Sequence, residues 1–201
     1  MDLRSNEKAV GSLFTQNVKS DPTDFSLYRA LAAHAAPRVA AWAGATAAAL
    51  QIRLAATPEA WRPTLESMPQ VLVHNDFNPR NLALRPEAAG GGLGLCAYDW
   101  ELATLGAPQQ DAAELLCFVL PPDVDRRTVD RWIDRAQSHL AATPAGRIDA
   151  AAWRRGVHAA LAQLLVDRFA FYTLIDRVRR QTFLPRVIAT CARLIELTEV
   201  P

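Results

Sequence analysis

The sequence predicts a predominantly helical α+β domain with one small β-hairpin region near its middle. Alanine, the residue with the highest intrinsic helix propensity, accounts for 37 of the 201 residues. Apolar residues also recur at helical spacing, as at Trp153, Val157, Leu161 and Leu165. The exception is the segment 71–98, where short β-prone runs flank a polar loop and a glycine-rich link.

The helices can be placed in chain order from this periodicity. We expect them over about 23–36, 38–56, 111–120, 125–142, 149–183 and 186–198. Pro37 predicts the break between the first two, because proline lacks a backbone donor and clashes with the preceding turn. Asp111 is a suitable N-cap for the third, since its carboxylate can accept from free N–H groups of the first turn.

Three short strands are expected between the second and third helices. Val71-Leu72-Val73 predicts one strand, and the runs 82–84 and 95–98 predict a hairpin joined by the glycine-rich link. Residues 1–22 are polar and unpatterned, which indicates a leader or linker. The domain prediction is therefore a leader over 1–22 and one domain over 23–201, with its polar motifs between 71 and 111.

The composition excludes several classes of protein. The 22 basic and 21 acidic residues leave a net charge of +1, so bulk charge does not favour nucleic acid. No apolar run has the length of a signal peptide or membrane span, which predicts a cytoplasmic protein without a membrane partner. Cys96, Cys117 and Cys191 form no CxxC pair and are expected to be reduced thiols.

The distribution of lysine is unusual. Arginine supplies 20 of the 22 basic residues, and the two lysines are Lys8 and Lys19. Any chemistry that requires an ammonium group must therefore find it before residue 20 or in another chain.

One loop carries a pattern of catalytic residues. In VLVHNDFNPRNLAL, residues 71–84, His74 is followed by Asp76 and then by Asn81, the H-x-D-x-x-x-x-N spacing of kinase catalytic loops. Phosphoryl transfer to an alcohol needs a carboxylate that accepts the hydroxyl proton and an oxygen ligand for the metal ion. We assign the first role to Asp76, the second to Asn81 and a structural role to His74.

A second acidic motif follows the predicted hairpin. Asp99 ends the strand in Tyr98-Asp99-Trp100-Glu101, and a hairpin would return it to the loop that holds Asp76 and Asn81. This position predicts a second metal ligand at Asp99. Glu101 is either a neighbour of the metal site or a structural hydrogen-bond acceptor. The match of Gly92-x-Gly94-x-x-Ala97 to a dinucleotide fingerprint lacks the required helix and is interpreted as a hairpin link.

The two motifs together resemble a known family. HNDFNPRN and YDWELATLGAPQQDAAEL, residues 74–81 and 98–115, are similar to the aminoglycoside phosphotransferase and choline kinase branch of the protein-kinase-like superfamily. The resemblance implies a protein-kinase-like C-terminal lobe, an ATP- and Mg²⁺-dependent transferase and catalytic-loop support from His74 and Asp111. The implied substrate is a hydroxyl of a small molecule or a peptide.

The sequence departs from that family before the catalytic loop. A family member carries an N-terminal β lobe with a phosphate-binding lysine, whereas the residues before 70 are mostly helical in pattern and Lys8 and Lys19 lie in no strand. We therefore expect the C-terminal lobe alone, complemented by a nucleotide-binding lobe from elsewhere or forming a homodimer. The alternatives are a non-catalytic kinase-like binding module and a plain helical domain in which the loop has no chemistry.

Overall fold

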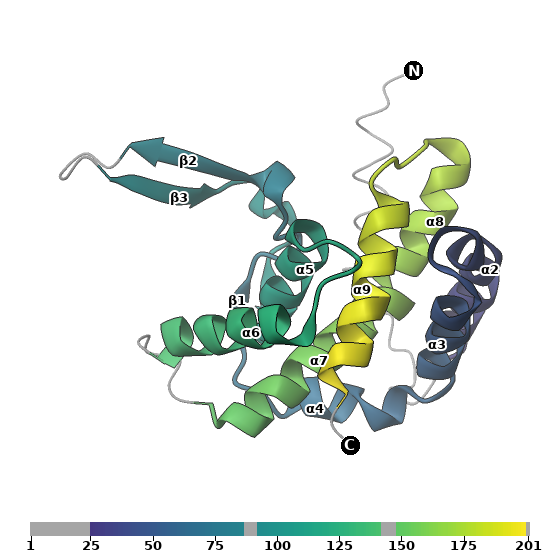
Figure 1. The fold of residues 1–201 in the computed structure, drawn as a ribbon, viewed down its shortest axis with the longest axis horizontal. Helices are drawn as coiled ribbons and strands as arrows, with labels where there is room; N and C mark the ends of the chain where they lie inside the picture. Colours follow the sequence, from purple (N-terminus) through teal and green to yellow (C-terminus); the bar gives the residue numbers. More distant parts are fainter. Residues whose placement is uncertain (1–24, 87–91, 142–147, 200–201) are drawn as a thin grey trace.

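The fold was analysed in a computed structural model that describes residues 25–86, 92–141 and 148–199 (Figure 1). The expected leader at 1–22 lies outside the described residues. The α-helices are α2 (Ser26–Ala43), α3 (Ala45–Ala56), α4 (Arg62–Glu66), α5 (Gln109–Val119), α6 (Arg126–Ala141), α7 (Ala150–Val166), α8 (Arg168–Val178) and α9 (Leu184–Thr198). Short 3₁₀ helices occur at η1 (Pro58–Ala60), η2 (Pro79–Asn81) and η3 (Trp100–Leu102). None of the described helices combines the length and the apolar character that crossing a membrane requires.

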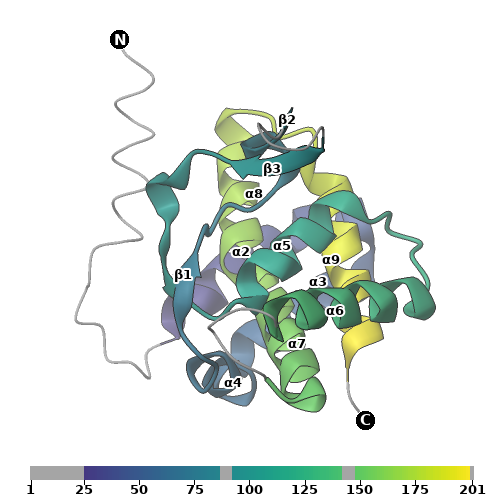
Figure 2. The ribbon, with the colours of Figure 1, turned by 90° about the vertical axis from the view of Figure 1, so that its left-hand side faces the viewer.

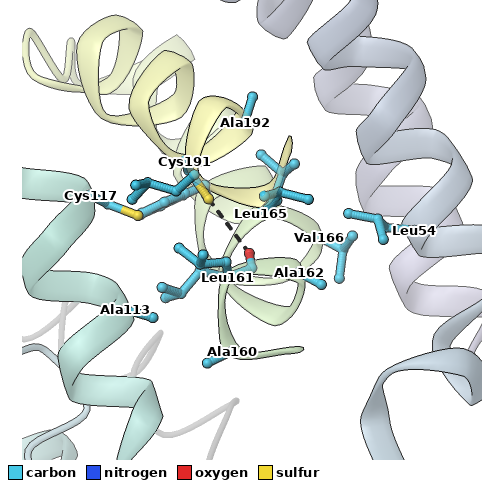
Figure 3. Close-up of a cluster of buried hydrophobic side chains, with 14 of the residues drawn as sticks. Leu54, Ala113, Cys117, Ala160, Leu161, Ala162, Leu165, Val166, Cys191 and Ala192 are labelled. Carbon is cyan, nitrogen blue, oxygen red and sulfur yellow. Dashed lines mark hydrogen bonds between the residues drawn. The ribbon is translucent and has the colours of Figure 1, made fainter. Parts of the chain in front are cut away.

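The core of the domain is built around α7. This helix packs against α5 and α9, and also against α3, α4 and α8. Figure 3 shows Cys117 of α5 next to Cys191 of α9, with Leu161 and Leu165 of α7 close to them, and all four side chains are buried. The Cys191 thiol donates to the Leu161 carbonyl at 3.5 Å, and both cysteines are free. The helices thus form one hydrophobic cluster.

The break between the first two helices is not at Pro37, as the sequence analysis expected. Helix α2 continues through Pro37, and the chain breaks at Gly44, whose φ of 90° and ψ of 163° suit glycine almost alone. Pro37 and Ala33 are both exposed, so the carbonyl that loses its helical donor lies on the solvent side. The helix tolerates the proline for this reason.

The long helix expected over 149–183 is two helices. The chain breaks at Asp167, where φ is −105° and ψ is −86°, so that α7 ends at Val166 and α8 begins at Arg168. The apolar face continues across this break because Leu165 and Phe169 are both buried. Periodicity therefore predicted the buried face and missed the change of direction.

The strands form two separate antiparallel pairs. The predicted hairpin is confirmed as β2 (Leu82–Pro86) paired with β3 (Leu93–Ala97), and Figure 1 shows it extending away from the helices. The predicted strand at 71–73 is β1 (Val71–Val73), but its partner β4 (Thr104–Gly106) was not predicted. Figure 2 shows β1 beside α4 and α5, below the hairpin. The loop 74–81 therefore joins one pair to the other.

Candidate functional site

His74 is the first residue of the loop between β1 and β2. Its side chain is fully buried, and its Nε2 is 2.8 Å from the Tyr98 carbonyl oxygen at the end of β3. The imidazole also contacts two aromatic rings, with centroid distances of 4.7 Å to Trp100 and 5.8 Å to Phe77. His74 thus connects the loop 74–81 with the segment that follows the hairpin.

Asp111 holds the start of this loop from helix α5. The sequence analysis expected Asp111 to be the N-cap of its own helix, but α5 begins at Gln109 with Pro108 as N-cap. The carboxylate instead accepts the backbone N–H of His74 at 2.7 Å and that of Asn75 at 2.9 Å. Its position in the first helical turn favours its negative charge, which strengthens both bonds.

Asp76 and Asn81 lie in direct contact. The amide nitrogen Nδ2 of Asn81 donates to Asp76 Oδ2 at 2.7 Å and to the Asp76 carbonyl at 3.0 Å. The amide of Asn78 donates to the other carboxylate oxygen, Oδ1, at 2.9 Å. Both oxygens of Asp76 are therefore oriented by amides of its own loop, while its side chain stays 19% exposed. A carboxylate held this way is accessible to a substrate.

Asp99 follows the last residue of the hairpin segment. The Tyr98 N–H donates to the Asn81 carbonyl at 3.0 Å, so Asp99 is adjacent to a residue bonded to the loop. Asp99 has a left-handed φ of 66° and makes no capping bond to η3. Its exposed carboxylate is thus unused by the local helix. Glu101, the other acidic residue here, is exposed within η3.

The chemistry of these side chains suits a hard cation. Because Nδ2 of Asn81 is bonded to Asp76, the amide oxygen of Asn81 is the atom of that side chain that can act as a metal ligand, and the exposed carboxylate of Asp99 is a second oxygen donor. Within the described residues, no three His, Cys, Asp or Glu side chains come together as a metal-binding group. Mg²⁺ is typically bound through one or two carboxylates together with substrate phosphates and water, so this donor set fits it.

Two residues that the sequence analysis missed support the same loop. Glu114 of α5 accepts the Phe77 N–H at 3.0 Å, and Arg168 of α8 donates to Glu114 at 2.7 Å. Arg168 also donates to the Asn75 side chain at 2.7 Å. Glu114 follows Asp111 by three residues, which places both on one helix face. Arg168 carries no comparable signal, because only folding brings α8 to the loop.

Burial affects the acidic groups in this network. Burial raises the pKa of Glu114, and the neighbouring Arg168 opposes that change. Burial also raises the pKa of Asp167, at the break between α7 and α8. The pKa of Tyr172 rises to about 12 from the same cause, although Arg168 lowers it. Arg168 is therefore the cation that acts on all three groups.

A small cavity lies behind the loop. It has a volume of about 40 Å³, and its lining includes Asn75, Glu114, Asp167 and Arg168. The buried Oε1 of Glu114 has no hydrogen-bond partner. The cavity has room for about one water molecule that could bond to such an atom. A nucleotide needs several hundred Å³, so this cavity is not its site.

Comparison with known proteins identifies the class and the family of this mostly helical domain with its two small antiparallel sheets. The model of the phosphotransferase enzyme family matches residues 15–148, which is more than half of the chain. The chain belongs to this family, which confirms the resemblance drawn from residues 74–115 and indicates phosphotransferase chemistry in general. Neither a curated protein nor a solved structure matches the chain. Helices α7, α8 and α9 lie outside the matched range.

Proposed function

We propose that the chain is the acceptor-binding part of an ATP- and Mg²⁺-dependent kinase that phosphorylates a hydroxyl of a small molecule or peptide. The observation that carries this proposal is the orientation of Asp76. Two amides, from Asn78 and Asn81, fix both carboxylate oxygens of an accessible side chain. Membership of the phosphotransferase enzyme family supplies the class of reaction.

Each proposed role follows from the chemistry of the side chain. Asp76 would orient the acceptor hydroxyl and take its proton as that oxygen bonds to the γ-phosphorus and the bond to the departing diphosphate breaks. Asn81 and Asp99 would hold Mg²⁺, which neutralises the phosphate charge when bound. His74 and Asp111 would keep the loop in shape, and Glu101 is the candidate neighbour of the metal site.

A separate nucleotide-binding lobe is part of the proposal. From residue 20 onward the sequence has no lysine, so the described residues provide no ammonium group for the phosphates. Each small sheet has one pair of leucines that lie opposite each other on neighbouring strands and are at least 60% exposed. These pairs are Leu72 with Leu105 and Leu84 with Leu95. Exposed apolar pairs of this kind favour a protein partner. The partner would be a lobe of another segment or chain, or a second copy.

The same leucines favour one alternative function. A kinase-like module without turnover would use this apolar surface to bind a partner, and it would keep the loop for its structure alone. The two functions differ in whether the site binds Mg²⁺ with a nucleotide.

Calorimetric titration with Mg²⁺ and ATP tests the proposal. We expect heat of binding for the wild type and its loss in Asp99→Asn, with no loss in the control Asp123→Asn, an exposed residue between α5 and α6. ATP turnover should be negligible for the chain alone and should appear with a complementing lobe. Turnover by the chain alone that Asp76→Ala abolishes would remove the need for a partner. Absence of binding, with and without a lobe, favours the non-catalytic module.

A further inference from the structure

Arg168 reaches the loop 74–81 from a part of the chain outside the matched family range. It is the first residue of α8, and 93 positions separate it from Asn75, to which it donates a hydrogen bond. Its side chain is only 16% exposed. A buried guanidinium requires acceptors that match its planar donors, so its partners show what it stabilises.

These partners lie on both sides of Asp76. On one side, Nη2 donates to Asn75 Oδ1 at 2.7 Å, and Asn75 has a left-handed φ of 58°. On the other side, Nη1 donates at 2.7 Å to Glu114 Oε2, the atom that accepts the Phe77 N–H. One planar group thus holds the residue before Asp76 directly and the residue after it through Glu114.

The same guanidinium faces Asp76. Nη1 lies 3.9 Å from Asp76 Oδ1, the oxygen that also accepts from Asn78. We propose that Arg168 is a positioning residue for Asp76: it holds the side chain of the preceding residue and, through Glu114, the backbone of the following one, and it supplies the positive charge beside the Asp76 carboxylate. This role rests on the function proposed above, in which Asp76 accepts the hydroxyl proton.

A purely structural ion pair between α5 and α8 is the competing explanation. Such a pair would stabilise the domain as a whole. Its loss would then weaken the protection of backbone amides against hydrogen exchange by the same factor in the loop and in the core. A positioning residue acts locally. The loop itself provides the comparison. The N–H groups of His74 and Asn75 are held by Asp111, so their exchange should not depend on Arg168, whereas the Phe77 N–H is held by Glu114, the partner of Arg168.

Residue-resolved amide hydrogen exchange by NMR measures this difference in the full chain. In Arg168→Gln, we expect exchange at Phe77 to accelerate by about tenfold more than at Leu161 in the core of α7. The His74 and Asn75 amides should change less than Phe77. Arg168→Lys should restore part of the protection, since an ammonium keeps the charge but cannot span both acceptors.

Two further variants complete the test. Arg154→Gln is the matched control, because Arg154 pairs with Asp130 and Asp134 on α6 and makes no contact with the loop. If Arg168→Gln does not fold, Asn75→Gly removes one acceptor of Arg168 while glycine keeps the left-handed backbone. We expect exchange at Phe77 to rise several-fold more than at Leu161 in that variant.

Uniform loss of protection across Phe77 and Leu161, or no change at Phe77, would overturn the positioning role. The exchange measurement requires no nucleotide, so it gives this answer even where the chain proves to have no phosphotransferase activity. With the complemented enzyme, Arg168→Gln should lower kcat by about tenfold and leave the KM for ATP within about twofold. A change in KM alone would contradict the role.

Discussion

The carboxylate of Asp111 accepts the backbone N–H of His74 at 2.7 Å, across 37 positions of sequence. A second bond, from the Asn75 N–H, uses the other carboxylate oxygen. The loop thus begins at a fixed point on helix α5, and Asp76 follows directly after that point. The orientation of Asp76 therefore depends on the contact between the start of the loop and α5 as well as on the hydrogen bonds within the loop.

Replacing Asp111 by alanine should destabilise the domain by about 2 kcal/mol. The change leaves two backbone donors without their charged acceptor, and each such bond contributes about 1.5–3 kcal/mol less the relaxation that water allows. Denaturant unfolding measures the loss. Asp125→Ala is the control, since Asp125 caps α6 through Thr128 at the surface and should cost about 1 kcal/mol or less. Equal effects for the two variants would contradict this account.

The position of the first helix break can be tested with two substitutions. Pro37→Ala should stabilise the domain by about 1–3 kcal/mol, because it restores a helical donor in the exposed middle of α2. Gly44→Ala should destabilise it by about 1–3 kcal/mol, because its backbone angles suit glycine. Thermal unfolding of both variants provides the measurement. Destabilisation by Pro37→Ala would show that the chain does break there.

Stability should fall as the pH rises through the range in which Asp167 ionises. Burial raises the pKa of Asp167 above its ordinary value, so the folded state holds its proton more tightly than the unfolded chain does. The contribution to stability is complete below the unfolded pKa and is lost as pH rises through the folded pKa. Asp167→Asn should therefore raise the denaturation midpoint at about pH 8 and have little effect at about pH 4.

The control for this pH dependence is Asp123→Asn at the exposed loop between α5 and α6. This control substitution should leave the difference in denaturation midpoint between the two pH values as it is in the wild type. An increase in stability for Asp167→Asn that is the same at both pH values would show that ionisation is not its cause.

The exposed leucines should control association and leave folding unaffected. The double substitution Leu72→Glu and Leu105→Glu adds charge to a register pair that is exposed in the described structure. We expect the circular dichroism spectrum to be unchanged and self-association, or binding to a complementing lobe, to be lost in sedimentation velocity runs. Leu27→Glu on the exposed side of α2 is the control. Unchanged association in the double variant would place the interface elsewhere.

Local patterns predicted those parts of the fold that depend on local chemistry. The apolar stripe through Trp153, Val157 and Leu161 predicted a buried helix, and these residues are buried in α7. Periodicity could not locate the break at Asp167, since Leu165 and Phe169 keep the stripe continuous. The pairing of β1 with β4 was missed as well, because Thr104-Leu105-Gly106 is too short to show alternation.

In the candidate site, too, local patterns identified some residues and tertiary contacts alone identified others. The spacing of His74, Asp76 and Asn81 predicted which side chains belong to one loop, and the structure shows Asn81 in contact with Asp76. The capping role predicted for Asp111 was wrong, since the first turn of a helix has the same sequence signature whether its carboxylate binds its own N–H groups or those of another segment. Arg168 depends on tertiary contacts alone, so no local pattern could have identified it.

Paramagnetic broadening by Mn²⁺ with ATP tests the central claim, that the residues around Asp76 form a metal–nucleotide site, most directly. Mn²⁺ substitutes for Mg²⁺ at oxygen ligands, and NMR detects its binding even when affinity is low. We predict selective broadening of the amide signals of 76–78, 80–81 and 98–100 in the wild type, and its loss in Asp99→Asn. Broadening that avoids both segments, or that persists unchanged in Asp99→Asn, would contradict the account.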